Sequence, residues 1–223
     1  VGRPNELALN YYEQGVDEII FLDAVASLYE RNSLIDILKD ACKEVFIPIT
    51  IGGGISKISD IEKLLESGAD KVAINSANFK NLNFISEAVS RFGSQAIIGS
   101  LVCRRHRYSW EAFKDNAKHR TNNNAIEWAK VLLNQGIGEL MLTSIDYEGR
   151  MIGFDEKLIN IISKFTKIPL IVSGGAGSSQ HVVNIFKNTN CDAVAIGSLL
   201  HYNKESILSI KENLKRNSLN TRI

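Results

Sequence analysis

Short apolar runs alternate along the chain with stretches whose apolar residues recur every three or four positions. The apolar runs are rich in Ile and Val and are mostly apolar at consecutive positions. That pattern is typical of strands in a parallel sheet, because helices cover such strands on both faces. The runs predict seven strands, at residues 18–23, 48–52, 71–75, 96–102, 139–145, 169–174 and 193–198.

The periodic stretches predict eight helices. Pro4 opens the first and Gly15 follows its end, which is the usual placement of these two residues. The other helices are predicted at residues 34–45, 59–67, 84–92, 125–135, 155–165, 180–187 and 204–216. The repeating unit is a strand followed by a helix, and the chain opens on a helix that has no strand before it.

This order predicts an α/β protein built as a (βα)8 barrel, in which the first strand and its loop lie outside the sequence. A closed barrel of eight units has about 250 residues, and the chain has 223. We expect one domain over residues 1–223, with the boundary between two half-barrels near residue 96. A doubly wound open sheet is the alternative architecture.

The chain also resembles itself, which favours the barrel. Residues 47–54 (IPITIGGG) recur as residues 168–175 (IPLIVSGG), and residues 70–76 recur as residues 192–198. Residues 21–23 recur more loosely as residues 144–146. A duplicated unit of this kind predicts approximate twofold symmetry. The functional face of such a barrel is the ring formed by the carboxyl ends of its strands.

Composition excludes several classes of protein. A net charge of +1 argues against a general binder of nucleic acid or of membrane surfaces. No apolar run approaches the roughly 20 residues that span a bilayer, and no signal-peptide pattern opens the chain. Cys42, Cys103 and Cys191 are odd in number and far apart, so they predict neither disulfides nor a zinc site. We expect a cytoplasmic protein.

Glycine-rich turns follow two strands in each half. Residues 52–54 and then Asn75-Ser76 occupy these positions in the first half, and residues 174–177 and then Gly197-Ser198 in the second. Glycine lets backbone N–H groups approach an anion closely. Two such sets at one mouth suit a substrate with a phosphate at each end. The alternative is that these glycines only form tight turns.

Several motifs together resemble the cyclase subunit of imidazole glycerol phosphate synthase, an enzyme of histidine biosynthesis. The resemblance covers the whole chain and separates this family from its sister isomerase, which shares the doubled barrel. The motifs lie at residues 21–27 (FLDAVAS), 52–55 (GGGI), 68–75 (GADKVAIN), 92–95 (FGSQ), 142–146 (LTSID) and 173–177 (SGGAG).

The resemblance implies a glutaminase partner on the amino-terminal face of the barrel and ammonia passing through the interior. The ammonia attacks a phosphoribulosyl ribonucleotide at the opposite face, with two aspartates as acid and base and with no metal or organic cofactor. The substrate's two phosphates would be bound by Gly54, Asn75 and Ser76 and by Gly149, Gly175 and Ser198. The ammonia gate would comprise Glu18, Lys71 and Glu139, which could also be ordinary solvated charges.

One position departs from the family. The aspartate expected at the end of strand 96–102 is Val102, which cannot transfer a proton, and the position of the other aspartate lies outside the chain. General acid–base catalysis typically contributes ~10²–10⁴-fold, so cyclisation is expected to suffer. Asp146 and Glu148 are the remaining candidate catalytic carboxylates. Cys103 is a further alternative, because the arginines that follow it would favour a thiolate.

The link at residues 104–123 is long and carries many basic and aromatic residues, as expected of a functional loop over a phosphorylated ligand. The resemblance allows three functions. Because of Val102 we expect a divergent branch that delivers ammonia, together with a sugar amidotransferase, for modification of a surface sugar, with cyclase activity uncertain. The alternatives are a working cyclase and a bisphosphate-binding scaffold.

Overall fold

The computed structural model describes residues 3–23 and 32–222. Part of the motif at residues 21–27 therefore lies outside the described residues. The seven predicted strands are all present, with ends that differ by a few residues from the prediction. They are β1 (Ile19–Leu22), β2 (Ile49–Gly52), β3 (Lys71–Ile74), β4 (Ile97–His106), β7 (Glu139–Ser144), β8 (Leu170–Ser173) and β9 (Ala193–Ala195).

The eight predicted helices are present as well, and short helical turns are added to them. The predicted helices are α1 (Pro4–Glu13), α2 (Asn32–Glu44), α3 (Ile58–Glu66), α5 (Phe84–Phe92), α6 (Ala125–Asn134), α7 (Glu156–Ser163), α8 (Ser179–Asn188) and α10 (Ile207–Arg216). The additions are α4 (Ser76–Lys80), α9 (Ser198–His201) and η1 (Ser94–Ala96). No helix in the described part of the chain is long and apolar enough to cross a membrane.

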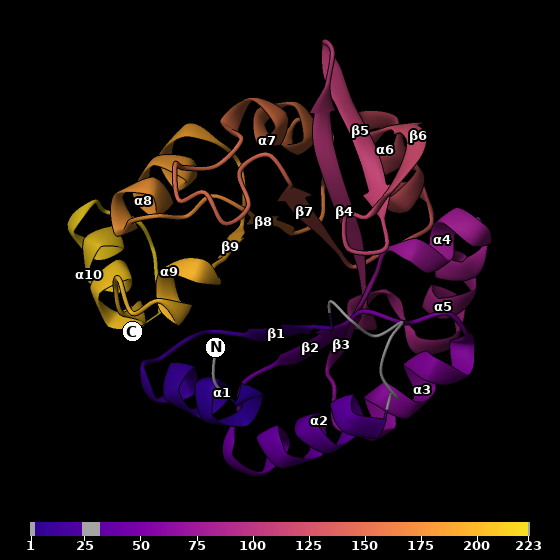
Figure 1. Ribbon diagram of the computed structural model, residues 1–223, viewed down its shortest axis with the longest axis horizontal. Helices are drawn as coiled ribbons and strands as arrows, with labels where there is room; N and C mark the ends of the chain where they lie inside the picture. Colours follow the sequence, from indigo (N-terminus) through magenta and orange to yellow (C-terminus); the bar gives the residue numbers. More distant parts are fainter. Residues whose placement is uncertain (1–2, 24–31, 223) are drawn as a thin grey trace.

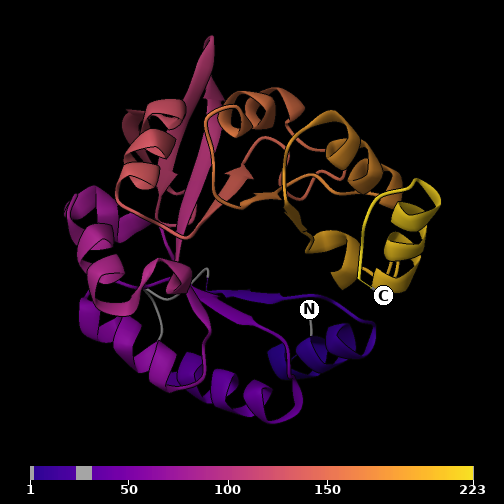
Figure 2. The ribbon, with the colours of Figure 1, turned by 180° about the vertical axis from the view of Figure 1, so that it is seen from behind.

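The seven strands are parallel and are paired in the order β1-β2-β3-β4-β7-β8-β9. Figures 1 and 2 show this sheet curving into a nearly closed barrel, with the helices on its outer side. The fold class predicted from the sequence, a (βα)8-type barrel, is confirmed. Among the described residues no ladder joins β1 to β9, so these two strands are the edges of the sheet.

Side chains alternate between the two faces of the sheet, as the pleat requires. The outer face packs on the helices in one large cluster, to which Ile51, Ile97 and Leu101 belong with no exposed surface. The inner face forms a smaller cluster centred on Ala73, Ile98, Met141 and Ile171. This cluster shows which faces of β3, β4, β7 and β8 border the barrel interior, and burial of each large aliphatic side chain contributes about 1.5–3 kcal/mol.

The repeat seen in the sequence recurs in the backbone. Asp70 accepts a hydrogen bond from the N–H of Ile49 at 2.8 Å, and Asp192 accepts one from Leu170 at the same distance. The residues that precede α4 and α9, Asn75 and Gly197, have φ and ψ of −119° and −77° and of −116° and −77°. The two halves therefore end their strands in the same way.

The link at residues 104–123 is not a loop. β4 continues to His106 and forms an antiparallel hairpin with β5 (Ser109–Lys114), which pairs in turn with β6 (His119–Asn124). The far end of the β4–β5 ribbon projects beyond the neighbouring helices (Figures 1 and 2). The prediction failed because the charged Glu111 interrupts the apolar residues of β5 and because β6 is mostly exposed and polar, so neither strand contains a continuous apolar run.

Candidate active site

Val102 lies on the inner face of the sheet, near the carboxyl end of the parallel part of β4. Ile98 belongs to the inner cluster, and alternation places Ser100 and Val102 on the same face. The continuous register with β7, in which Val102 pairs with Thr143, shows that no bulge reverses this orientation. Val102 is half-buried. An apolar side chain therefore lines the barrel mouth where the resemblance implies an acid.

Cys103 points the opposite way. Its side chain lies in the core between the sheet and the helices and has no exposed surface. Its thiol donates to the carbonyl of Thr143 at 3.6 Å. Burial, with smaller contributions from Asp155 and Asp146, raises the pKa of Cys103 far above its ordinary value. The alternative of a reactive thiolate is wrong, because the arginines that were expected to favour it lie on the exposed part of the strand.

Asp146 lies beyond the end of β7 and is bound to the β4 extension. Its Oδ2 accepts a hydrogen bond from the backbone N–H of Arg105 at 2.6 Å, and its Oδ1 lies 3.8 Å from Nε of Arg104. A third of its side chain is exposed. The carboxylate therefore ties the hairpin to β7, and its Oδ2 is occupied by a backbone donor.

Glu148 is the more accessible of the two candidate carboxylates. Its backbone N–H donates to the carbonyl of Ser144 at 3.0 Å, which fixes the turn, while its side chain is exposed. Desolvation by the surrounding turn raises the pKa of Glu148, and solvent screens part of that effect. A carboxyl group with a raised pKa is suited to exchanging a proton near neutral pH.

The first predicted phosphate site lies at the ends of β2 and β3, which are neighbours in the sheet. Gly54 is exposed and has a φ of +63°. Asn75 donates from Nδ2 to the carbonyls of Ser100 at 2.9 Å and Phe113 at 3.1 Å. The hydroxyl of Ser76 donates to Oδ1 of Asn75 and accepts the N–H of Asp115 at 2.8 Å. The side chains of Asn75 and Ser76 thus hold the β5 end of the hairpin.

The second predicted site lies at the ends of β8 and β9, beside the turn that follows β7. A Cβ at Gly175 would lie 1.8 Å from the carbonyl oxygen of Gly153, whose N–H donates to the carbonyl of Gly175 at 2.8 Å. Gly149 has open space around its Cα, and Ser198 opens α9. Close backbone packing therefore requires glycine at position 175.

Lys71, Glu18 and Glu139 form one ionic cluster at the opposite end of the strands. Lys71 Nζ lies 2.9 Å from Glu18 Oε2 and 2.6 Å from Glu139 Oε1. Burial lowers the pKa of Lys71, but the hydrogen bonds to Glu139 and Glu18 outweigh it, so the pKa is raised overall. Each residue stands two positions before an inner-face residue, namely Ile20, Ala73 or Met141. Alternation therefore turns all three toward the barrel axis.

Sequence reasoning missed a buried polar contact between the hairpin and the barrel. Nε1 of Trp110 on β5 donates to Oδ2 of Asp155 at 2.8 Å, and both residues are almost fully buried. The position of Asp155 before a helical pattern predicted only a helix boundary. Its contact with Trp110 depends on long-range strand pairing, so no local signal could have revealed it.

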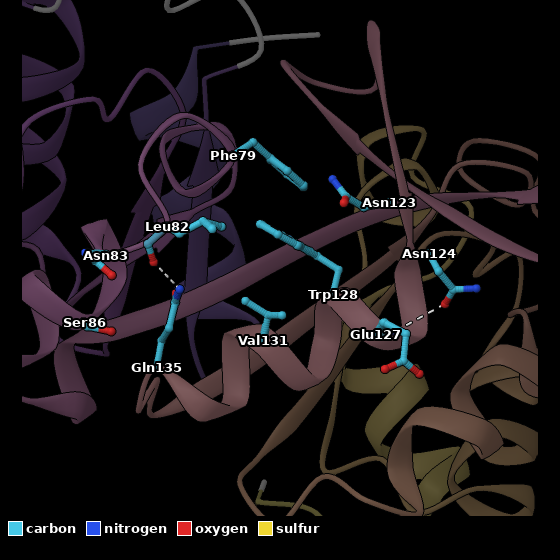
Figure 3. A pocket seen from close by; sticks show the side chains of 10 residues that line it. All are labelled: Phe79, Leu82, Asn83, Ser86, Asn123, Asn124, Glu127, Trp128, Val131 and Gln135. Carbon is cyan, nitrogen blue, oxygen red and sulfur yellow. Dashed lines mark hydrogen bonds between the residues drawn. The ribbon is translucent and has the colours of Figure 1, made fainter.

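A cavity of about 540 Å³ lies outside the barrel, between the α4–α5 region and α6 (Figure 3). The rings of Phe79 and Trp128 stack on each other there at 4.1 Å, and Gln135 donates to the carbonyl of Leu82. None of the predicted catalytic, phosphate-binding or gate residues lines this cavity. This cavity is therefore separate from the residues that the sequence predicts to act.

Comparison with known proteins agrees with this architecture. Residues 1–206 match the family described as "Histidine biosynthesis protein". Three relatives carry the name "Imidazole glycerol phosphate synthase subunit HisF". The relative from Hydrogenobaculum sp. is 45% identical over 223 residues, which is 100% of this chain and 88% of the relative.

The relative from Bacillus cereus is 40% identical over 224 residues, which is 100% of this chain and 89% of the relative. The relative from Methanococcus vannielii is 38% identical over 243 residues, with 100% and 89% covered. Each is named a subunit, so each belongs to a larger assembly. With this similarity over its full length, the chain belongs to the histidine biosynthesis protein family, in the group of HisF-type cyclase subunits.

Proposed function

We propose that the chain acts as the cyclase subunit of imidazole glycerol phosphate synthase. In that role it combines ammonia with the phosphoribulosyl ribonucleotide to give imidazole glycerol phosphate and the aminoimidazole carboxamide ribonucleotide. The observation that carries the proposal is the 45% identity to a subunit of that name over the whole chain. The chemistry at the two ends of the barrel supports it.

The two ends of the substrate are assigned to the two halves of the mouth. Gly54, Asn75 and Ser76 bind one phosphate, and Gly149, Gly175 and Ser198 bind the other. The backbone geometry shared by the turns before α4 and α9 supports this pairing. Because the side chains of Asn75 and Ser76 already bind the hairpin, their backbone N–H groups are the donors that we assign to the phosphate.

Glu148 is the carboxyl group that we assign to proton transfer at the mouth. Its exposure leaves it accessible to a ligand, and its raised pKa makes it a more effective proton donor at neutral pH. Asp146 holds the β4 extension and supplies negative charge beside Arg104. Val102 contributes no proton transfer.

Ammonia enters at the opposite end, through Glu18, Lys71 and Glu139, from a glutaminase subunit that docks on that face. The ionic cluster supports a gate because Lys71 bridges carboxylates from separate strands close to the barrel axis. A charged layer that satisfies itself can close the interior and open when a partner competes for one member. The inner cluster beyond it is apolar.

Turnover of the ribonucleotide with ammonium salts tests the proposal without a partner. We expect product from the wild-type chain, a loss of about 100-fold in kcat for Glu148→Gln, and little change for the control Glu212→Gln on α10. Glu212 is an exposed carboxylate that pairs with Arg216 within the same helix. Absence of product from the wild type would overturn the cyclase function, and equal rates for the two variants would overturn the role of Glu148.

A second function is favoured by one observation, the inward orientation of Val102. In this alternative the barrel delivers ammonia to a sugar amidotransferase for modification of a surface sugar and no longer cyclises. The wild-type chain would then stimulate its glutaminase without consuming the ribonucleotide. Val102→Asp separates the two functions, with Val102→Asn as a control of similar size that transfers no proton. If Val102→Asp raises the cyclisation rate at least about tenfold and Val102→Asn does not, the barrel has lost only one acid.

A further inference from the structure

The β4–β5 ribbon presents two faces of opposite character at the barrel mouth. Arg104 is on the same face as Val102, and its guanidinium lies over the ring of Phe113 at 5.5 Å. Arg105 is on the other face, opposite Trp110 in the register, with its guanidinium 5.8 Å from that ring. Trp110 is 3% exposed, whereas half of the Arg104 side chain is exposed. One face therefore anchors the ribbon, and the other carries the half-exposed Arg104 on the same side as Val102.

The anchor ends on a buried carboxylate. Asp155 is 5% exposed, and its Oδ2 accepts Trp110 Nε1 at 2.8 Å and the hydroxyl of Ser144 at 3.4 Å. Its Oδ1 accepts the N–H of Leu158 at 3.2 Å, which caps α7. No ion pair of Asp155 is found within residues 3–23 and 32–222, so this buried carboxylate depends on these donors, because an unsatisfied one is costly. Trp110 is the only one of these three donors that comes from the hairpin.

The position of Trp110 sets the position of the arginines. Trp110 pairs with Arg105, whose backbone N–H donates to Asp146 at 2.6 Å, and Arg104 Nε lies 3.8 Å from the same carboxylate. On the other side, Asn75 and Ser76 hold the β5 end at Phe113 and Asp115. The ribbon is thus fixed at both sides of the mouth, and the contact with Asp155 fixes the side nearer to the arginines.

We propose that Asp155 is a positioning residue that acts through Trp110 to hold Arg104 at the barrel mouth, where its guanidinium binds a phosphate group of the ligand. The phosphorylated class of the ligand rests on the proposed function, whereas the anchoring of the hairpin does not. A planar guanidinium on a fixed strand suits a phosphate, because little freedom is lost when it binds. Loosening the anchor keeps the positive charge of Arg104 but no longer fixes the orientation of its guanidinium.

Three variants test the anchor. Trp110→Phe keeps the ring and removes the N–H donor. Asp155→Ser keeps a good cap for α7 with a side chain too short to reach Trp110. Trp128→Phe is the matched control, because it changes the other tryptophan, which stacks on Phe79 outside the hairpin. Hydrogen exchange of the two indole N–H groups is followed by NMR, and Asp155→Ser is expected to accelerate exchange at Trp110 at least tenfold but not at Trp128.

The second readout is binding of inorganic phosphate, followed through the Arg104 Nε–H resonance. Trp110→Phe and Asp155→Ser should weaken the Kd by about tenfold, and Trp128→Phe should leave it unchanged. In turnover, the first two variants should raise KM by a similar factor with kcat within about twofold. Arg104→Ala should raise KM as well, and adding Trp110→Phe to it should cause little further loss, because both act through one guanidinium.

The outcomes separate this inference from the cyclase function. Unchanged indole exchange in Asp155→Ser, or phosphate binding by Trp110→Phe as tight as by the wild type, overturns the positioning role. Additive losses for Arg104→Ala and Trp110→Phe also overturn it, because Trp110 would then act elsewhere. If the wild type consumes no ribonucleotide but the exchange and phosphate results hold, the cyclase function fails and the positioning role stands.

Discussion

Lys71 of β3 and Glu139 of β7 are joined by a 2.6 Å ion pair across the start of the strand that separates them, β4. Both side chains are mostly buried, at 15% and 17% exposed. A charge pair of this kind differs from a surface pair, because each partner has little contact with solvent to replace the other when it is removed. It therefore links the stability of the barrel to its proposed gate.

Replacing Lys71 with Met should lower the free energy of unfolding by about 2 kcal/mol, because Glu139 then loses a charged hydrogen bond in a partly buried site. The control is Lys43→Met, which removes the exposed 2.7 Å pair with Asp40 and should cost less than about 1 kcal/mol. Urea denaturation measures both. Equal costs for the two variants would show that the ionic cluster of Lys71, Glu18 and Glu139 behaves like a surface pair.

The same cluster predicts a dependence of stability on pH. The pKa of Lys71 is raised in the folded protein, so its stabilising contribution is fully present below the unfolded value of about 10.4 and is lost as pH rises through the folded pKa. The difference in unfolding free energy between wild type and Lys71→Met should therefore be constant at lower pH and shrink as pH rises above about 10.4. A difference that stays constant or grows above this pH would contradict the assignment.

Gly175→Ala should destabilise the protein strongly, by about 3 kcal/mol or more, because a Cβ would lie 1.8 Å from the carbonyl oxygen of Gly153 and φ is +115°. Gly149→Ala is the matched control, with a φ of +71° but nothing within 4 Å of the added atom. It should cost only the conformational strain, about 1–2 kcal/mol. Thermal unfolding of the two variants measures the difference, and equal shifts in Tm would refute the backbone contact.

Cys103 should resist alkylation in the folded protein. It is fully buried with a raised pKa, so little thiolate forms and no reagent reaches it, whereas Cys42 and Cys191 are half-buried. Maleimide labelling at pH 8, read by mass spectrometry of peptides, should modify Cys103 only in urea. Rapid labelling of native Cys103 would show that the end of β4 opens in solution.

The seven barrel strands and the repeat were predictable from the sequence for a physical reason. A parallel strand covered on both faces is mostly apolar at consecutive positions, so β8 is visible as the run Leu-Ile-Val and β2 as two isoleucines on either side of a buried Thr50. Each run is followed by glycines at positive φ, and this pattern recurs in both halves. The local sequence was sufficient to predict these strands, because burial on both faces permits few residue types.

Tertiary structure alone decided the hairpin and the contacts at the mouth. The strand pairing that places Trp110 on Asp155 joins residues far apart in the sequence, and the exposed strand β6 contains the polar residues of an ordinary loop. The orientations of Val102 and Cys103 likewise followed only once the inner cluster had identified the interior face of the sheet. The sequence determined which elements form, because their burial leaves a local pattern. Only the packing of those elements against one another determined which polar groups come into contact.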